Sequence, residues 1–91
     1  MHPSTMNRAE LERTAWAREF KTDSPVSYTE AIELAARPDL VVDVERATTV
    51  LGEPCFAILV ADRTPAFWMD HKVTRKAAEA LCKDMGWRVR R

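Results

Sequence analysis

Cysteine, histidine and aspartate are the residue types in this chain that could together perform nucleophilic catalysis. Cys55 or Cys82 would be the nucleophile, His71 the base and Asp70 the group that orients it, as in a thiol-dependent hydrolase. However, Asp70 and His71 are adjacent, and adjacent side chains of a strand point to opposite faces of a sheet. Both cysteines lie within apolar patterns, whereas a catalytic thiol needs an exposed, electropositive setting. We therefore expect residues 70–72 to be a polar connection, both cysteines to be small buried core residues, and the protein not to be an enzyme.

The residues that could bind a metal ion or a phosphate also lack the spacing that such sites need. The candidate metal ligands are His2, Cys55, His71 and Cys82, and no two of them lie a few residues apart, as the ligands of structural zinc sites do. The chain has 2 glycines, too few for a glycine-rich phosphate loop, and it contains no GxSxG, HExxH or CxxC motif. The sequence therefore predicts no metal site, no cofactor and no catalytic residue.

The cysteines and the apolar runs bear on where the protein works. Two reduced thiols fit the cytoplasm, although a disulfide between Cys55 and Cys82 would join a predicted strand to the last helix and is geometrically possible. The first seven residues lack the apolar core of a signal peptide, and no apolar run approaches the roughly 20 residues of a membrane span. We expect a cytoplasmic protein with no membrane partner.

Charge is unevenly distributed along a chain whose net charge is zero and whose isoelectric point is near 6.7. Residues 22–70 contain nine acids and three bases, a net charge of −6, whereas residues 71–91 contain seven bases and two acids, a net charge of +5. Such a basic end either binds an anionic partner or is neutralised by the acidic middle within the fold.

The basic end places two positive charges at the start of the last helix, which lowers the stability of that helix. Thr74 is the expected N-cap, and Arg75 and Lys76 follow it where the helix dipole is already positive. Free N–H groups beside two cations make this helix start a candidate anion or nucleic-acid site. The basic tail would extend the site through Arg88, Arg90 and Arg91. The alternative, which we favour for a chain of zero net charge, is that Arg75 and Lys76 pair with acids such as Asp70.

The order helix–strand–strand–strand–helix, with the stretch Thr-Arg-Lys-Ala-Ala at residues 74–78, is similar to the double-stranded RNA-binding domain. In that family lysines at this helix start contact phosphates, so the resemblance implies duplex binding through Arg75 and Lys76. The chain departs from the family in lacking its glycine before this helix and its usual first-helix motif.

Tryptophans are the largest apolar side chains available to a small core. The chain has Trp16, Trp68 and Trp87. In a strand predicted over residues 66–70, Phe67 and Met69 point one way, while Trp68 and Asp70 point the other. Trp68 and Asp70 are therefore the candidate protein-interaction residues, because an exposed tryptophan is a typical interface anchor. The alternative, which we favour, is that all three tryptophans fill the small core or lie across its rim.

Two capping boxes mark where helices begin. They are formed by Asn7 with Glu10 and by Ser27 with Glu30, with Val26 and Ala31 as a hydrophobic staple at the second. These signals predict helices over residues 8–20 and 28–36, the second ended by Pro38. The apolar stripe of the first helix is not clean, because Leu11 and Ala15 lie opposite its other apolar residues.

Residues 40–51 satisfy two patterns at once. Apolar residues recur at helical intervals from Leu40 to Leu51, but the many β-branched side chains favour a strand. We favour the strand, because residues 42–44 and 87–89 are similar alternating segments that each follow a helix and suit a sheet edge.

The clearest elements lie in the last third of the chain. Residues 55–60 are a nearly continuous apolar run, typical of a central strand, and residues 66–70 are its partner after a turn. The final helix begins after Thr74 and ends at Gly86, which fits the left-handed C′ position with Trp87 folding back over the helix.

Together these signals predict a single α+β domain over residues 7–91, after a disordered segment at residues 1–6. Its core is a short antiparallel β-meander of about three strands, with residues 55–60 at its centre, packed against two or three helices in the order α-α-β-β-β-α. We expect a small, non-catalytic cytoplasmic protein that binds another protein, as phage and mobile-element accessory proteins do. Nucleic-acid binding through the basic end and thiol-dependent catalysis are the alternatives.

Overall fold

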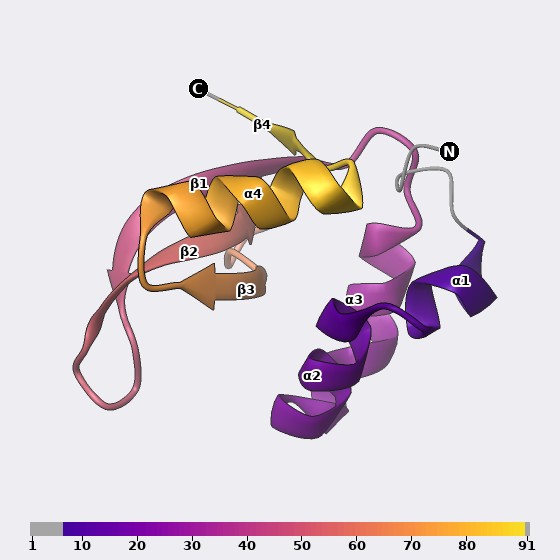
Figure 1. Cartoon of the computed structure of the whole chain (residues 1–91), viewed down its shortest axis with the longest axis horizontal. Helices are drawn as coiled ribbons and strands as arrows, with labels where there is room; N and C mark the ends of the chain where they lie inside the picture. The colour runs from indigo at the N-terminus through magenta and orange to yellow at the C-terminus, as the bar shows by residue number, and fades with distance from the viewer. Residues whose placement is uncertain (1–6, 91) are drawn as a thin grey trace.

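The structure, a computed structural model, describes residues 7–90 and has four α-helices and a four-stranded sheet in that part of the chain (Figure 1). The helices are α1 (Arg8–Glu12), α2 (Ala15–Asp23), α3 (Tyr28–Ala35) and α4 (Arg75–Met85), with a 3₁₀ turn, η2 (Pro25–Ser27), before α3. The strands are β1 (Val41–Thr48), β2 (Pro54–Val60), β3 (Trp68–Lys72) and β4 (Arg88–Val89). The predicted class and element order are confirmed, with β4 added at the end. The segment predicted to be disordered, residues 1–6, lies outside the described residues, as does Arg91.

The strands form one mixed sheet in the order β3-β2-β1-β4. β1 pairs antiparallel with β2 along nearly its whole length, so residues 40–51 contain a strand, as their β-branched composition predicted. β3 pairs antiparallel with β2, and β4 runs parallel to β1. Residues 87–89 therefore reach a sheet edge as expected, whereas residues 42–44 lie inside the sheet.

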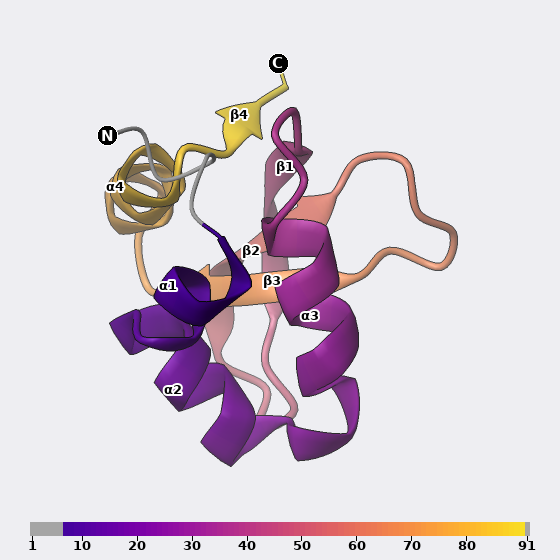
Figure 2. The ribbon, with the colours of Figure 1, turned by 90° about the vertical axis from the view of Figure 1, so that its right-hand side faces the viewer.

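One face of the sheet carries the core. Side chains of paired residues point to the same face, and on this face Val42, Val44, Ile58 and Val60 join one buried cluster with residues of α2, α3 and α4. α4 lies along β1 and β2, while α1, α2 and α3 gather near one end of the sheet (Figures 1 and 2). The described residues of the opposite face contribute nothing to this cluster, although Cys55 and Ala57 are buried there.

The helix predicted over residues 8–20 is instead two helices, separated at Thr14. The Thr14 hydroxyl donates to Leu11 O (2.7 Å) and accepts from Ala17 N (3.2 Å), so one side chain ends α1 and caps α2. The break changes the direction of the chain, and Leu11 becomes 1% exposed in the core beside Trp16. The irregular apolar stripe in the sequence thus reflects two helices, each burying its own side.

Of the two predicted capping boxes, only the first forms. Asn7 and Glu10 bond reciprocally through side chain and main chain. Ser27 makes no side-chain cap, because the turn η2 leads directly into α3 and leaves Ser27 with ψ near 1°, outside the extended N-cap conformation. The predicted staple is also wrong, since Val26 is 97% exposed.

β3 begins at Trp68, two residues later than predicted. The loop before it is held against the helices, because Arg63 pairs with Glu30 and Phe67 stacks on Phe20 with ring centroids 6.2 Å apart. Phe67 O still accepts from Val60 N of β2 (2.9 Å), and the β2–β3 register is irregular between Ile58 and Leu59, so regular pairing begins only at Trp68.

α4 is capped at both ends as predicted. Thr74 Oγ1 accepts a first-turn N–H at 3.1 Å. Gly86, at φ +75°, donates its N–H to Lys83 O, and Trp87 donates its N–H to Cys82 O (2.9 Å). This is the Schellman arrangement, and it returns the Trp87 side chain to the core.

Trp16 ties α2 to the sheet. Its indole Nε1 donates to Met69 O on β3 in a buried bond of 2.7 Å. Its ring also packs edge-on against Trp87, with centroids 5.2 Å apart and planes at 82°. The indole Nε1 of Trp87 is buried with no acceptor among the described residues. The two indoles therefore share one contact in the core, but only one of them makes a hydrogen bond.

This difference gives a test in which the two tryptophans are each other's control. Trp16→Phe and Trp87→Phe remove similar buried volume, but only Trp16→Phe leaves Met69 O without its donor. We expect Trp16→Phe to lower the free energy of unfolding by about 1 kcal/mol more than Trp87→Phe, measured by urea denaturation. An equal loss, or a larger one for Trp87→Phe, would contradict the role given to the bond.

Candidate interaction groove

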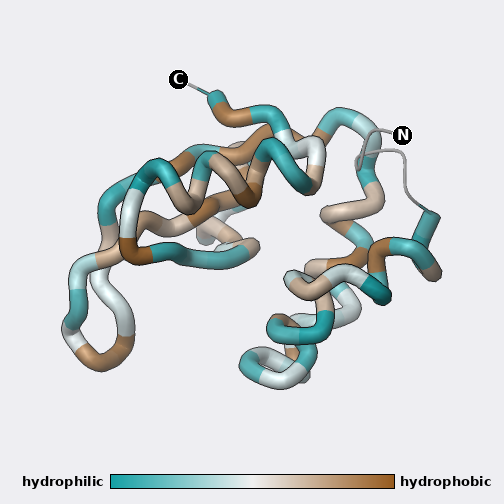
Figure 3. Tube along the Cα trace, viewed as in Figure 1, coloured by the Kyte–Doolittle hydropathy of each residue, from teal (hydrophilic) through white to brown (hydrophobic). Residues whose placement is uncertain are grey.

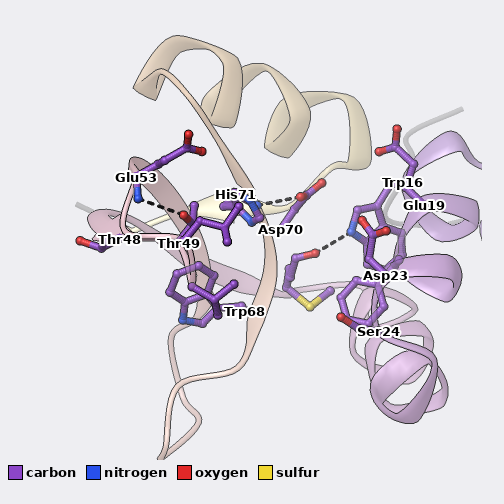
Figure 4. A pocket seen from close by; sticks show the side chains of 14 residues that line it. Trp16, Glu19, Asp23, Ser24, Thr48, Thr49, Glu53, Trp68, Asp70 and His71 are labelled. Atoms are coloured by element: carbon purple, nitrogen blue, oxygen red, sulfur yellow. Dashed lines mark hydrogen bonds between the residues drawn. The ribbon is translucent and has the colours of Figure 1, made fainter.

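A hollow of about 620 Å³ lies between α2, β3 and the hairpin that joins β1 to β2. Trp16 and Phe20 line it from α2, Trp68 lines it from β3, and Leu51 lines it from the hairpin. Figure 4 shows the labelled hairpin residues on one side of β3 and those of α2 on the other. We call this hollow the groove.

The tip of the hairpin is apolar and held by a set of hydrogen bonds. Thr49 N donates to Glu53 O (2.8 Å), Thr49 O accepts from Gly52 N (2.9 Å), and Thr49 Oγ1 accepts from Glu53 N (3.1 Å). Gly52 supplies φ +84°, which residues with a side chain rarely adopt. The turn thus holds Val50 and Leu51 at its central positions, 102% and 83% exposed, where polar residues are usual. Figure 3 shows this tip as a hydrophobic end on a polar loop.

Trp68 is the exposed tryptophan of the described chain. It is 38% exposed, whereas Trp16 and Trp87 are each 4% exposed. Its ring meets that of His71 edge-on, with centroids 6.0 Å apart. Burial, which we favoured for all three tryptophans, is thus found for Trp16 and Trp87 but not for Trp68, the best candidate for an exposed one, and Trp68 lines the groove.

The groove is rimmed by acids. Its lining contains Glu19, Asp23, Glu53 and Asp70, and no lysine or arginine. Two cations, Arg18 and Lys72, line a neighbouring hollow that shares Asp70 with the groove, and Lys72 Nζ lies 3.8 Å from Asp70 Oδ2. The other three carboxylates form no ion pair with any residue of the range 7–90.

Asp70 is the partly buried member of this set. Burial raises the pKa of the Asp70 carboxyl above its ordinary value, and the negative charge of Glu19 adds to the rise. The His71 N–H bond and the charge of Lys72 oppose the shift without cancelling it. At neutral pH the groove therefore holds a carboxylate whose charge costs the folded state free energy.

On the edge of β3 that borders the groove, some main-chain groups are already hydrogen-bonded to side chains. Met69 O accepts from Trp16 Nε1, and His71 N donates to Asp70 Oδ1 (2.7 Å). Side chains therefore take two main-chain groups that an added strand would need, as natural edge strands often arrange.

Arg75, which opens α4, is engaged within the fold. Its Nη1 donates to Val44 O (3.2 Å), beyond the point where β4 ends, and its guanidinium lies over the Phe56 ring at 5.2 Å. It also lies 3.8 Å from Glu79 of its own helix. The pairing that we favoured, with acids of residues 22–70 such as Asp70, is not found for Arg75, which is instead engaged by Glu79 of its own helix and by a strand carbonyl.

The other residues of the predicted anion site are only partly brought together. Arg90 holds Asp43 in two bonds, Nε to Oδ1 at 3.1 Å and Nη2 to Oδ2 at 2.8 Å. Lys76 and Arg88 are exposed and make no ion pair within residues 7–90, and Arg91 lies outside that range. Two exposed cations are what remains for an anionic partner in the described part of this patch.

Both cysteines are free and buried, as expected, so the possible disulfide does not form. Burial raises the pKa of the Cys82 thiol to about 12, which is the opposite of the shift that activates a nucleophilic thiol. Among the described residues no hydrogen bond joins either sulfur to His71, and no three possible ligand side chains are grouped around a metal position. His2, the other candidate ligand, lies outside those residues.

Comparison with known proteins provides no family for this chain, since no family model, curated protein or solved structure matches it. The helices of residues 7–90 include none with the length and apolar character needed to cross a membrane.

Two residues of the groove, Trp68 and Asp70, could be named from the sequence, whereas the apolar tip could not. Leu51 fitted the end of the strand that we favoured and of the helical stripe that we did not, but it lies at the centre of a turn. The available signal was a pair of large apolar residues directly before Gly52, a position where a turn residue would be expected.

The raised pKa of Asp70 predicts how its stability effect depends on pH. Because the folded-state pKa lies above the ordinary value near 3.8, the penalty is absent below that value and present once the carboxylate is ionised in the folded state. We expect Asp70→Asn, which keeps an acceptor for His71 N, to be more stable than the wild type at pH 7. Urea denaturation should show the difference shrinking toward pH 3, with Asp39→Asn as an exposed control. A destabilised Asp70→Asn at pH 7 would contradict this assignment.

The buried cysteines predict slow thiol chemistry. In the folded protein at pH 8, Cys55 and Cys82 should react with an aromatic disulfide reagent only as the chain unfolds, because neither sulfur is accessible and the high pKa leaves Cys82 almost fully protonated. Two thiols should be counted at once in denaturant. Rapid reaction of one cysteine in the native protein would instead support the thiol-dependent alternative.

Proposed function

We propose that this chain is a non-catalytic, cytoplasmic protein-binding domain that takes a segment of its partner on the hairpin tip and in the groove. The observation that carries the proposal is the pair Val50 and Leu51, which a hydrogen-bonded turn holds out in water. Large apolar side chains in this position have no role in the core of the described chain. Contiguous exposed apolar surface is typical of interaction sites.

Magnitudes show why the tip needs the groove beside it. Burying Val50 and Leu51 together would contribute roughly 3–5 kcal/mol. Association costs an estimated 4–15 kcal/mol in lost freedom, so the tip by itself would not retain a partner. Phe20 and Trp68, the partly exposed aromatic residues of the groove, add contact area of the kind that dominates most interfaces. The rigid turn lowers the cost further, because little conformational freedom remains to be lost.

Nucleic-acid binding through the basic end is the weaker candidate on this geometry. Arg75 and Arg90 are already bonded to groups of their own chain. Lys76 and Arg88 could contact phosphates, and a duplex-binding titration at low salt would measure this directly. Loss of binding in Lys76→Glu/Arg88→Glu, with a steep salt dependence, would favour this candidate over the groove.

Selection from a random peptide library displayed on phage, with the full chain immobilised, tests the proposal. Individual peptides would then be titrated calorimetrically against three proteins: the wild type, Val50→Ser/Leu51→Ser, and Val26→Ser/Val73→Ser. The last is a matched control, because Val26 and Val73 are 97% and 82% exposed and lie outside the groove. We expect the tip variant to bind selected peptides about tenfold more weakly than the other two.

Both variants should unfold at the wild-type temperature, since none of the four side chains is buried. Peptides that bind all three proteins equally, or the absence of any selected peptide, would contradict a binding function for the tip and the groove.

A further inference from the structure

The charges around the groove indicate what kind of segment would fit it. Glu19, Asp23 and Glu53 surround an apolar floor and form no ion pair within residues 7–90, and no lysine or arginine shares the lining. Elsewhere in the described chain, acids such as Asp43 and Asp62 are bound by arginines. The rim of the groove is thus an acidic surface without counter-charges of its own, apart from Lys72 behind Asp70.

Asp70 gives a second reason to expect a cationic partner, because it lies partly buried at the same rim. A cation placed beside it would stabilise a carboxylate whose pKa is raised by burial and by Glu19. Sites that hold such a charge without a full partner are typically kept for binding, at some cost to stability.

The occupant is not expected to extend the sheet. On the free edge of β3, Met69 O and His71 N are already bonded to Trp16 and Asp70. A bound segment would therefore contact the groove mainly through side chains, as an amphipathic helix does.

A second copy of this chain fits the groove poorly. Its helices carry exposed cations on α2, whose largest apolar residue Trp16 is buried, and on α4, where Lys76 and Lys83 are exposed. The exposed apolar residues of α4 are alanines, Ala77 and Ala80, because its larger apolar side chains face the core. α4 therefore offers the charge but lacks the large side chain that the groove and the tip would bury.

We propose that the partner segment is a cationic amphipathic helix, with large apolar residues seated against Trp68, Val50 and Leu51 and with lysines or arginines facing Glu19, Asp23 and Glu53. This inference rests on the proposed function and specifies its partner. Apolar contact supplies affinity, while the charges select against acidic segments.

The probes are two designed 14-residue amphipathic peptides, one of leucine and lysine and one with glutamate in place of each lysine. Binding to the full chain would be followed by calorimetry and by acrylamide quenching of tryptophan fluorescence, which acts mainly on Trp68 because the other tryptophans are each 4% exposed. We expect the lysine peptide to shield Trp68 from acrylamide and to bind at least tenfold more tightly than the glutamate peptide.

Two triple variants separate the groove from general charge effects. Glu19→Gln/Asp23→Asn/Glu53→Gln removes the rim charges, and Glu33→Gln/Asp39→Asn/Asp84→Asn removes three exposed charges in comparable settings outside the groove. We expect the first to bind the lysine peptide about tenfold more weakly, with little further loss at 0.5 M salt, and the second to bind nearly as the wild type does.

Several results would overturn the inference. They are equal binding of the two peptides, no binding of either, an equal loss in both triple variants, or a dimer of the chain that is lost in Val50→Ser/Leu51→Ser. The peptide selection distinguishes this failure from failure of the proposed function. Selected peptides that depend on the tip but lack lysine and arginine would leave the binding function standing and remove the cationic partner.

Discussion

The buried hydrogen bond from Trp16 Nε1 to Met69 O is the interaction on which the arrangement of this molecule most depends. It joins a helix near the start of the chain to the edge strand of the sheet, and the same indole packs against Trp87 beyond the last helix. One side chain thus connects α2, β3 and the end of α4. Because the bond fixes α2 beside β3, it also sets one wall of the groove, so the core and the candidate site share their main support.

The groove combines features that stability alone would not favour. Two large apolar residues stand in water at the hairpin tip, and Asp70 keeps a charge that burial penalises. Both features lie on well-supported parts of the fold, a turn closed by Thr49 and a strand anchored by Trp16. Binding sites typically combine such destabilising features with a rigid framework, because the free energy that the features cost the folded protein is offset when a partner binds.

Prediction succeeded where one short segment contained the whole cause of its structure. The Thr74 cap and the Gly86 end of α4 depend on hydrogen bonds within a few residues, and both form as expected. Prediction failed where distant groups intervened. The pairing of β3 with β2 is irregular near Leu59, so β3 begins at Trp68, and the turn η2 removes the expected Ser27 cap. A threonine such as Thr14 is compatible with the inside of a helix and with an N-cap. The cap forms here, and the break that it makes lets Leu11 join the same core cluster as Trp16.

The sequence by itself determined the α+β class, the order of elements and the buried state of both cysteines. These follow from periodicity, caps and the small number of ways in which a short chain can cover its apolar side chains. Tertiary structure alone decided that Val50 and Leu51 face water, that the acids at the rim remain without lysine or arginine, and that Arg75 is engaged by β1. The reason is that charge pairing and exposure depend on which segments meet in space, and the Trp16 bond that brings α2 to β3 spans 53 positions of the sequence.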